Sequence, residues 1–209
     1  MSINAVANFI SFPVGIVCLI LSIRAFYIYS LSRSELLAVL GFAMGSIATG
    51  IFIGNIGEAH LFGITYNTEW ARYTGSSSGA LFIFLSSLIR SQAQLQRLRR
   101  WQILVAIFFL LIIVLIPILP PFASPWIPFG LNSIRIVIYG AAFLRYTGLY
   151  LSKGTRFSLI ISIGFILLVT GFSLNAPGLL SHNFATLTIT GAFVRIAGYS
   201  TMSLAYSIK

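Results

Sequence analysis

Acidic side chains are almost absent from this chain of 209 residues, which contains no aspartate and only three glutamates, Glu35, Glu58 and Glu69. Charged residues make up 8% of the sequence and hydrophobic residues 58%, with a mean hydropathy of +0.98. A water-soluble domain carries about three times as much charge, because its surface must interact with water. The composition therefore excludes a soluble globular fold and predicts a protein whose solvent is the lipid bilayer.

Cysteine and histidine are scarce as well. The single cysteine, Cys18, can form no internal disulfide and is interpreted as a small apolar packing residue. His60 and His182 are expected at the outer mouth of the bundle with Glu58 and Glu69, but Glu58 and His60 are two residues apart and do not share a face of a continuing helix. We interpret this cluster as solvated loop residues, and we expect no metal, no haem and no enzymatic activity.

Apolar runs recur along the chain, each long enough to cross about 30 Å of hydrocarbon as a helix of about 20 residues. The run over 72–91 is the most polar, because it contains Arg72, Thr74 and three consecutive serines. The sequence predicts an all-α polytopic membrane protein, a seven-transmembrane-helix bundle in a single transmembrane domain over residues 1–209. The expected spans are 8–30, 35–57, 72–91, 102–121, 127–150, 157–177 and 184–207.

Positive charges concentrate in every second loop, and this alternation predicts the orientation of the chain. Cationic loops remain on the cytoplasmic side of a membrane, so we expect the N-terminus outside and the C-terminus in the cytoplasm. The net charge of +10 is expected to face anionic lipid headgroups of the bilayer, and no nucleic-acid binding is expected. The cationic loops and their borders contain Arg33, then Arg90, Arg97, Arg99 and Arg100, then Lys153 and Arg156.

The two halves of the chain share an order of residues that indicates an internal repeat. Each half has three expected spans, an odd number, and one span lies between the halves, so both halves point the same way across the membrane. We predict a parallel 3+1+3 arrangement with repeat 1 at about 8–91, a linker helix at about 102–121 and repeat 2 at about 127–207. Matched pairs include Tyr29 with Tyr150, Gly50 with Gly171, Arg72 with Arg195, and Gly75 with Gly198.

Arginines inside the expected spans are the strongest candidates for function, because an ionised side chain in hydrocarbon costs at least about 2.5 to 3.5 kcal/mol. Side chains three or four residues apart share a helix face, and we predict that polar groups of three such faces line the bundle interior. Three alternatives are open for them: bonding to carbonyls, amides, hydroxyls or water, binding an anionic or carbonyl-bearing ligand, or pairing with Glu58. The predicted ligand-binding residues are Asn132, Arg135, Tyr139, Arg195, Tyr199, Arg72 and Ser76.

Residues 70–73, Trp-Ala-Arg-Tyr, resemble a motif of microbial rhodopsins, which also have seven helices and an external N-terminus. The resemblance implies a carboxylate counter-ion a few residues after the motif and a retinal-binding lysine on the last helix. Gly75 and Ser76 follow the motif here, and the last span offers Arg195. Arginine cannot form a Schiff base, so covalent retinal is excluded, whereas a noncovalent pigment or lipid stays compatible.

The seven-helix plan also resembles the sensor modules of bacterial membranes that precede histidine kinases and cyclases. This resemblance implies a bacterial or archaeal cytoplasmic membrane, and because no output domain follows before Lys209, a separate membrane or cytoplasmic partner protein. The repeat is similar to the SWEET and PQ-loop carriers, although the Pro-Gln dipeptide is absent. We expect a receptor-like or sensory protein that binds a small amphiphilic or anionic ligand. The alternatives are a small-solute carrier working by alternating access and an accessory subunit of a membrane complex.

Overall fold

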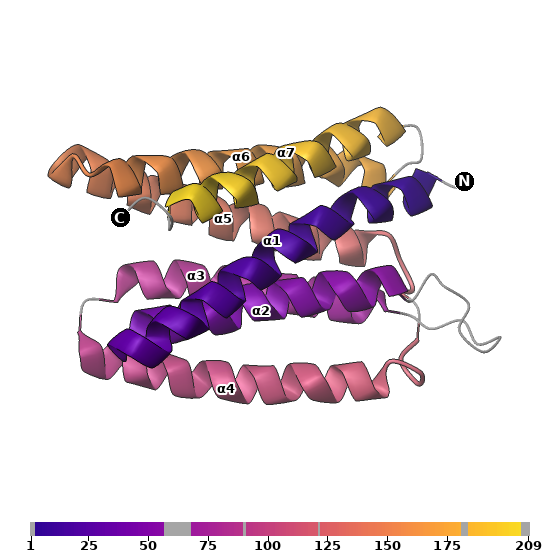
Figure 1. Ribbon diagram of the computed structural model, residues 1–209. Helices are drawn as coiled ribbons and strands as arrows, with labels where there is room; N and C mark the ends of the chain where they lie inside the picture. The colour runs from indigo at the N-terminus through magenta and orange to yellow at the C-terminus, as the bar shows by residue number, and fades with distance from the viewer. Residues whose placement is uncertain (1–2, 57–67, 90, 121, 181–183, 206–209) are drawn as a thin grey trace. The chain divides into compact units, whose positions relative to one another are not determined.

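A computed structural model describes residues 3–56, 68–89, 91–120, 122–180 and 184–205. These residues form seven α-helices and no strand, as the composition and the apolar runs predicted (Figure 1). The helices are α1 (Ile3–Ser32), α2 (Glu35–Ile56), α3 (Glu69–Leu88), α4 (Gln92–Leu115), α5 (Trp126–Lys153), α6 (Arg156–Leu180) and α7 (Ala185–Ala205).

Five of the described helices are long and apolar enough to cross a membrane, which indicates a helical integral membrane protein. They are α1, α2, α4, α5 and α6, with candidate spans Ile10–Ser32, Glu35–Asn55, Gln92–Leu115, Trp126–Lys153 and Arg156–Leu180. α3 and α7 are richer in hydroxyl and glycine residues, because they pack closely against other helices.

Several helices extend beyond the apolar runs. α4 begins at Gln92, well before the expected span at 102, because the glutamines and arginines of its first turns are good helix formers. Ser91 caps this helix, since its hydroxyl accepts a hydrogen bond from the Gln94 backbone N–H at 3.3 Å. The first turns of α4 therefore carry their cations on a helix rather than on a loop.

α1 and α5 end in the same way. Arg33 follows α1 with a φ of 56°, and its backbone N–H donates to the Tyr29 carbonyl at 2.8 Å. Gly154 follows α5 with a φ of 63°, and its N–H donates to the Tyr150 carbonyl at 2.7 Å. A left-handed residue at this position stops a helix and satisfies one of its last carbonyl groups.

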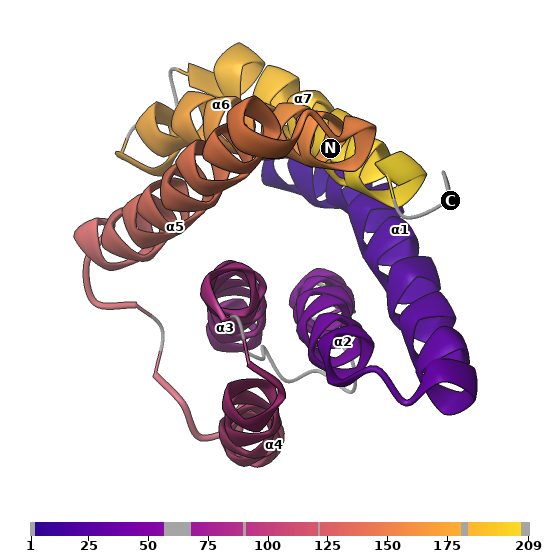
Figure 2. The same cartoon turned by 90° about the vertical axis from the view of Figure 1, so that its left-hand side faces the viewer.

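The chain divides into two compact units, and each is described by itself. Unit 1 consists of Met1–Val17 and Ser124–Lys209 and contains the start of α1 with α5, α6 and α7. Unit 2 is Cys18–Ala123 and contains the rest of α1 with α2, α3 and α4. Figure 2 looks along the three neighbouring helices α2, α3 and α4 of unit 2.

In unit 2, glycines bring α2 and α3 into close antiparallel contact. A Cβ on Gly75 would lie 2.6 Å from the Ser46 carbonyl oxygen and 3.1 Å from the Gly50 Cα. A Cβ on Gly79 would lie 2.6 Å from the Ala43 carbonyl oxygen. Since no heavy atom can occupy these positions, the backbones can approach each other only where the side chain is a hydrogen.

α4 is joined to the other helices of unit 2 by polar bonds at one end and by apolar packing along its length. Arg99 Nη1 lies 2.8 Å from Glu35 Oε2 and donates to the Tyr29 hydroxyl at 2.9 Å. The Gln102 side-chain amide donates to the Val39 carbonyl at 2.9 Å. Farther along, Phe109 packs in a buried cluster with Ala71, Ile116, Ile53 and Ile113. Only a narrow face of α4 is therefore buried in its unit.

In unit 1, α6 and α7 pack against each other through glycines spaced seven residues apart. A Cβ on Gly164 would lie 3.2 Å from the Gly198 carbonyl oxygen, and one on Gly171 would lie 2.9 Å from the Gly191 carbonyl oxygen. Gly178, the next member of the series, faces Thr188. A seven-residue spacing keeps these small residues on one side of α6, so the two helices stay in close antiparallel contact over several turns.

This packing predicts different effects for two glycine-to-alanine substitutions. Gly171→Ala should destabilise the protein by about 1 to 3 kcal/mol, because the added methyl meets the backbone of α7 and the Arg195 stem. Gly148→Ala on α5 is the matched control, since its Cβ would meet nothing within 4 Å and alanine favours a helix. Melting temperatures of the purified variants in detergent test this difference, and equal values would contradict the close packing of α6 on α7.

Candidate functional site

One face of α5 carries three polar side chains into the interior of unit 1. Asn132, Arg135 and Tyr139 recur at helical spacing, and their exposed fractions are 0%, 5% and 0%. A guanidinium with so little contact with solvent needs polar or aromatic neighbours, because it remains charged. These neighbours come from α6 and α7.

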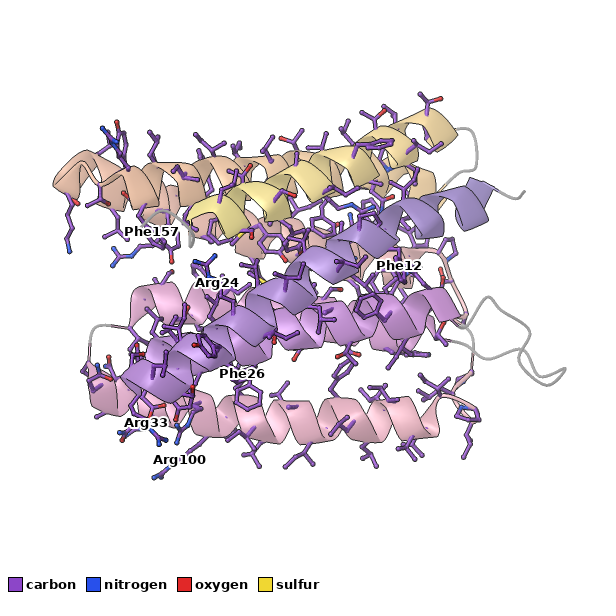
Figure 3. All side chains as sticks on the ribbon, in the orientation of Figure 1. Phe12, Arg24, Phe26, Arg33, Arg100 and Phe157 are labelled. Atoms are coloured by element: carbon purple, nitrogen blue, oxygen red, sulfur yellow. The ribbon has the colours of Figure 1, made fainter. Side chains whose placement is uncertain are left out.

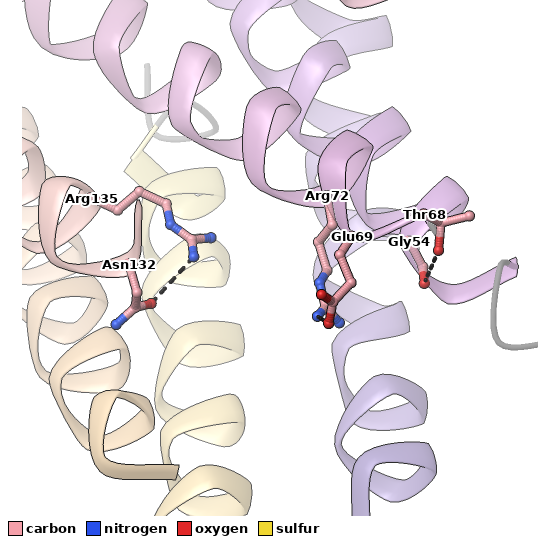
Figure 4. A network of polar contacts seen from close by, with 6 residues as sticks. All are labelled: Gly54, Thr68, Glu69, Arg72, Asn132 and Arg135. Atoms are coloured by element: carbon pink, nitrogen blue, oxygen red, sulfur yellow. Dashed lines mark hydrogen bonds and ion pairs between the residues drawn. The ribbon is translucent and has the colours of Figure 1, made fainter. Parts of the chain in front are cut away.

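Asn132 connects α5 to α6 and orients Arg135. Its side-chain N–H group donates to the Phe172 carbonyl at 2.9 Å. Its Oδ1 accepts a hydrogen bond from Arg135 Nη2 at 3.3 Å (Figure 4). The Asn132 side chain thus donates to the α6 backbone and accepts from the Arg135 guanidinium.

The ring of Phe172 contacts two guanidinium groups. Arg135 Cζ lies 4.7 Å from the ring centroid, and Arg195 Cζ lies 5.1 Å from the same centroid. Arg195 Nε also donates to the Gly191 carbonyl one turn earlier on α7, at 3.3 Å. Contacts of a cation with an aromatic face contribute about 0.5 to 2 kcal/mol each, more where water is excluded. Phe172 is 3% exposed and Arg135 5%, whereas Arg195 is half-buried.

A tyrosine pair adjoins the arginines. The hydroxyl oxygens of Tyr139 and Tyr199 are 2.8 Å apart and share a hydrogen bond between α5 and α7. The Tyr139 ring also stacks on Phe172, with 5.6 Å between centroids. Either hydroxyl can be the donor in this bond, and the other hydroxyl then carries a proton that points elsewhere. We call the six residues Asn132, Arg135, Tyr139, Phe172, Arg195 and Tyr199 the arginine–aromatic cluster.

The charges of unit 1 are all positive at the level of side chains. Residues 1–17 and 124–209 contain no aspartate or glutamate. The Cζ atoms of Arg135 and Arg195 lie 4.7 Å and 5.1 Å from one ring centroid. They are therefore at most about 10 Å apart, where two unit positive charges repel each other by roughly 1.7 kcal/mol at an effective dielectric constant of about 20. Arg135 and Arg195 therefore produce a positive potential around Phe172 that no carboxylate side chain of the same unit offsets.

This cluster has the chemistry of an anion-recognition site. Guanidinium groups bind carboxylates and phosphates through paired N–H donors, and tyrosine hydroxyls add neutral donors. The rings of Phe172, Tyr139 and the neighbouring Phe165 offer apolar surface beside these donors. A small anion with an apolar portion fits both properties.

Two further predicted ligand-binding residues, Arg72 and Ser76, lie on α3 in unit 2. Arg72 Nη2 forms an ion pair with Glu69 Oε1 at 3.5 Å (Figure 4). The Ser76 hydroxyl donates to the Arg72 carbonyl. The Glu69 side chain is 48% exposed, so this pair contributes little to stability. Thr68, just before α3, donates to the Gly54 carbonyl at 3.2 Å and ties the start of α3 to α2.

Of the outer-mouth cluster, only Glu69 belongs to the described residues; Glu58, His60 and His182 lie outside them. Within the described part of the chain, no group of three or more histidine, cysteine or acidic side chains could hold a metal ion.

Phe172 was missed by the sequence analysis, although it joins the two arginines. The chain has 18 phenylalanines, and a single aromatic residue in an apolar helix carries no signal of its own. The available hint was its position next to Gly171, one of the residues matched between the two halves. Only the packing of α6 between α5 and α7 identifies it.

The tyrosine pair predicts a measurable coupling between α5 and α7. In a double-mutant cycle, Tyr139→Phe and Tyr199→Phe remove one hydroxyl each and keep the rings. We expect a coupling free energy of about 0.6 kcal/mol and at most about 1.7 kcal/mol, the average and the maximum for hydrogen bonds between membrane helices. Reversible unfolding of the four proteins in mixed micelles measures it, and additive effects would show that the two hydroxyls act independently.

No known protein family, no curated protein and no solved structure matches this chain.

Proposed function

We propose that this chain is a receptor-like or sensory integral membrane protein that binds a small anionic or amphiphilic ligand at the arginine–aromatic cluster. The observation that carries the proposal is the placement of two guanidinium groups on the single ring of Phe172. They lie in a unit whose sequence supplies no carboxylate side chain. Two guanidinium groups on one ring repel each other, and an anionic ligand that contacts both converts this repulsion into attraction.

The chemistry of the donors defines the ligand class. Arg135 and Arg195 offer charged N–H groups, and the tyrosine pair can donate one further hydroxyl proton. The buried Phe172 ring makes the surroundings of these donors apolar. A carboxylate with an aromatic or short aliphatic body suits this site best. Its oxygens accept hydrogen bonds from these donors, and its apolar body leaves no buried polar atom without a hydrogen bond.

We further propose that all seven helices span the membrane, with the N-terminus outside and a parallel 3+1+3 repeat. Two features support the repeat. α1 and α5 end in the same left-handed cap four residues after a tyrosine. In addition, the helix pairs α2 with α3 and α6 with α7 both pack through glycines. α3 and α7 would then span the membrane because hydroxyl groups such as those of Thr74, Thr190 and Thr201 donate to carbonyls one turn earlier in the same helix.

Ligand binding would act on the packing of α5, α6 and α7. An anion held by both arginines attracts α5 and α7 toward each other across Phe172 of α6. Asn132 transmits any shift of Arg135 to the α6 backbone, because it bonds to both. A ligand that favours one arrangement shifts the population of the bundle toward it, and a separate membrane or cytoplasmic partner protein would detect that change.

The test combines native mass spectrometry and absorbance of the gently purified protein with thermal-shift titrations of acetate, benzoate and inorganic phosphate. We expect a bound small molecule, or a rise in melting temperature with at least one anion, since a ligand at 100 times its Kd stabilises by about 2.7 kcal/mol. Arg135→Gln and Arg195→Gln should abolish this response. Their ligand-free melting temperatures should change little, because the loss of the contact with Phe172 is offset by the removal of a charge that is buried at Arg135 and half-buried at Arg195.

Arg156→Gln is the matched control, because Arg156 is an exposed arginine of the same unit. It should keep the full anion response. Variants of Arg135 and Arg195 that melt earlier but still respond fully to the anion would show that both arginines are purely structural. An empty bundle that retains another polypeptide would favour an accessory subunit instead.

A small-solute carrier is the second candidate, and the glycine-packed helix pair in each unit favours it, because paired repeats are typical of alternating access. This function predicts that cysteines placed along α1 and α5 change their reactivity toward an external thiol reagent when a transported solute is added. The native Cys18 is buried and supplies little background. Labelling that is the same with and without solute at every position would argue against a carrier.

A further inference from the structure

The outward face of α4 combines arginine, tryptophan and apolar side chains in a fixed order. Arg97, Arg100 and Trp101 are exposed near the start of the helix. Leu104 and Phe108 follow on the same face, with exposed fractions of 57% and 61%. Leu111 continues this face at 51% exposure. Steps of three and four residues connect these positions, so they form one continuous surface. We call these six residues the α4 outer face.

The opposite side of α4 is occupied by its own unit. Arg99 is paired with Glu35, and Gln102 donates to the Val39 carbonyl. Among the described residues, neither Arg97 nor Arg100 forms an ion pair. Of the three arginines of α4, Arg99 bonds within unit 2, whereas Arg97 and Arg100 lie on the outer face.

A third arginine lies at the same end of unit 2. Arg33, in the turn between α1 and α2, is exposed, and Figure 3 shows it at the end of the unit that also carries Arg100. The acidic side chain nearest to it in sequence, Glu35, is already paired with Arg99. This end of unit 2 therefore presents positive charge beside an apolar helix face.

We propose that the α4 outer face binds an anionic phospholipid, at a site separate from the arginine–aromatic cluster. Arg97 and Arg100 contact the headgroup phosphate, with Arg33 adding to the positive potential, and Trp101 lies at the level of the glycerol backbone. The acyl chains lie along Leu104, Phe108 and Leu111. With a rise of about 1.5 Å per residue, the helix from Arg100 to Leu111 is roughly 16 Å long, close to half of the ~30 Å hydrocarbon thickness.

The order of chemistry along α4 favours a lipid over a protein helix as the occupant. The face changes from cationic to interfacial to fully apolar within a few turns, as a phospholipid changes from phosphate to glycerol to acyl chain. From Ile103 to Leu115 the helix carries no side chain that can form a hydrogen bond. Specific helix association in a membrane uses small or hydrogen-bonding residues, which the apolar part of this face, Leu104, Phe108 and Leu111, lacks.

Native mass spectrometry with mixed phosphatidylglycerol and phosphatidylcholine micelles tests the proposal on the full chain. We expect bound phosphatidylglycerol at a preference of about tenfold or more over phosphatidylcholine, since each basic residue near anionic lipid contributes severalfold. R97Q/R100Q should lose this preference. The matched control K153Q/R156Q removes two exposed cations of unit 1 and should retain it.

Fluorescence quenching by brominated lipids places the site. The difference in quenching between the wild-type protein and Trp101→Phe isolates Trp101, and brominated phosphatidylglycerol should quench it more than brominated phosphatidylcholine at equal mole fraction. Excess inorganic phosphate should leave this preference unchanged, whereas competition by phosphate would assign the arginines to a soluble anion and overturn the proposal. Three other results would also overturn the proposal. They are equal quenching of Trp101 by both lipids, a lipid preference that is unchanged in R97Q/R100Q, and a co-purified protein that protects Trp101 from both lipids.

Discussion

The close approach of α6 and α7 at Gly171 is the constraint on which the candidate site depends. A Cβ at this position would lie 2.6 Å from Arg195 Cγ, so the stem of Arg195 occupies the space that glycine leaves open. The guanidinium consequently lies beside the ring of Phe172, the next residue on α6. Arg135 reaches the same ring from α5, oriented by Asn132. Without the glycine contact, the two cations would not share one aromatic ring.

The two units differ in the acidic side chains that they supply to their arginines, and this difference supports the proposed function. In unit 2, Arg99 pairs with Glu35 and Arg72 with Glu69, so both cations have carboxylate partners. In unit 1 the sequence supplies cations without any acidic side chain. An ion pair at the surface stabilises a fold modestly, whereas ionised side chains inside a membrane protein are costly and are typical of ligand and ion sites. The proposed anion would take the role that glutamates have in unit 2.

Much of the fold could be predicted from the apolar runs, because a helix is the element that satisfies its own backbone hydrogen bonds in lipid. The helix boundaries were less accurate where polar residues continue a helix, as in the first turns of α4. For the site, helical spacing was enough to group Asn132 with Arg135 and Tyr139. It could not show that Tyr139 and Tyr199 share a hydrogen bond or that Phe172 contacts both arginines, since these contacts join three different helices.

By itself, the sequence determined the solvent of the protein, its all-helical class and the absence of acidic side chains from residues 124–209, because these follow from composition and local periodicity. Only the tertiary structure decided which cations are paired and which share Phe172. The physical reason is that a helix face specifies which side chains point in one direction, whereas their partners depend on the rotation and depth of neighbouring helices. Those are set by the glycine contacts between backbones.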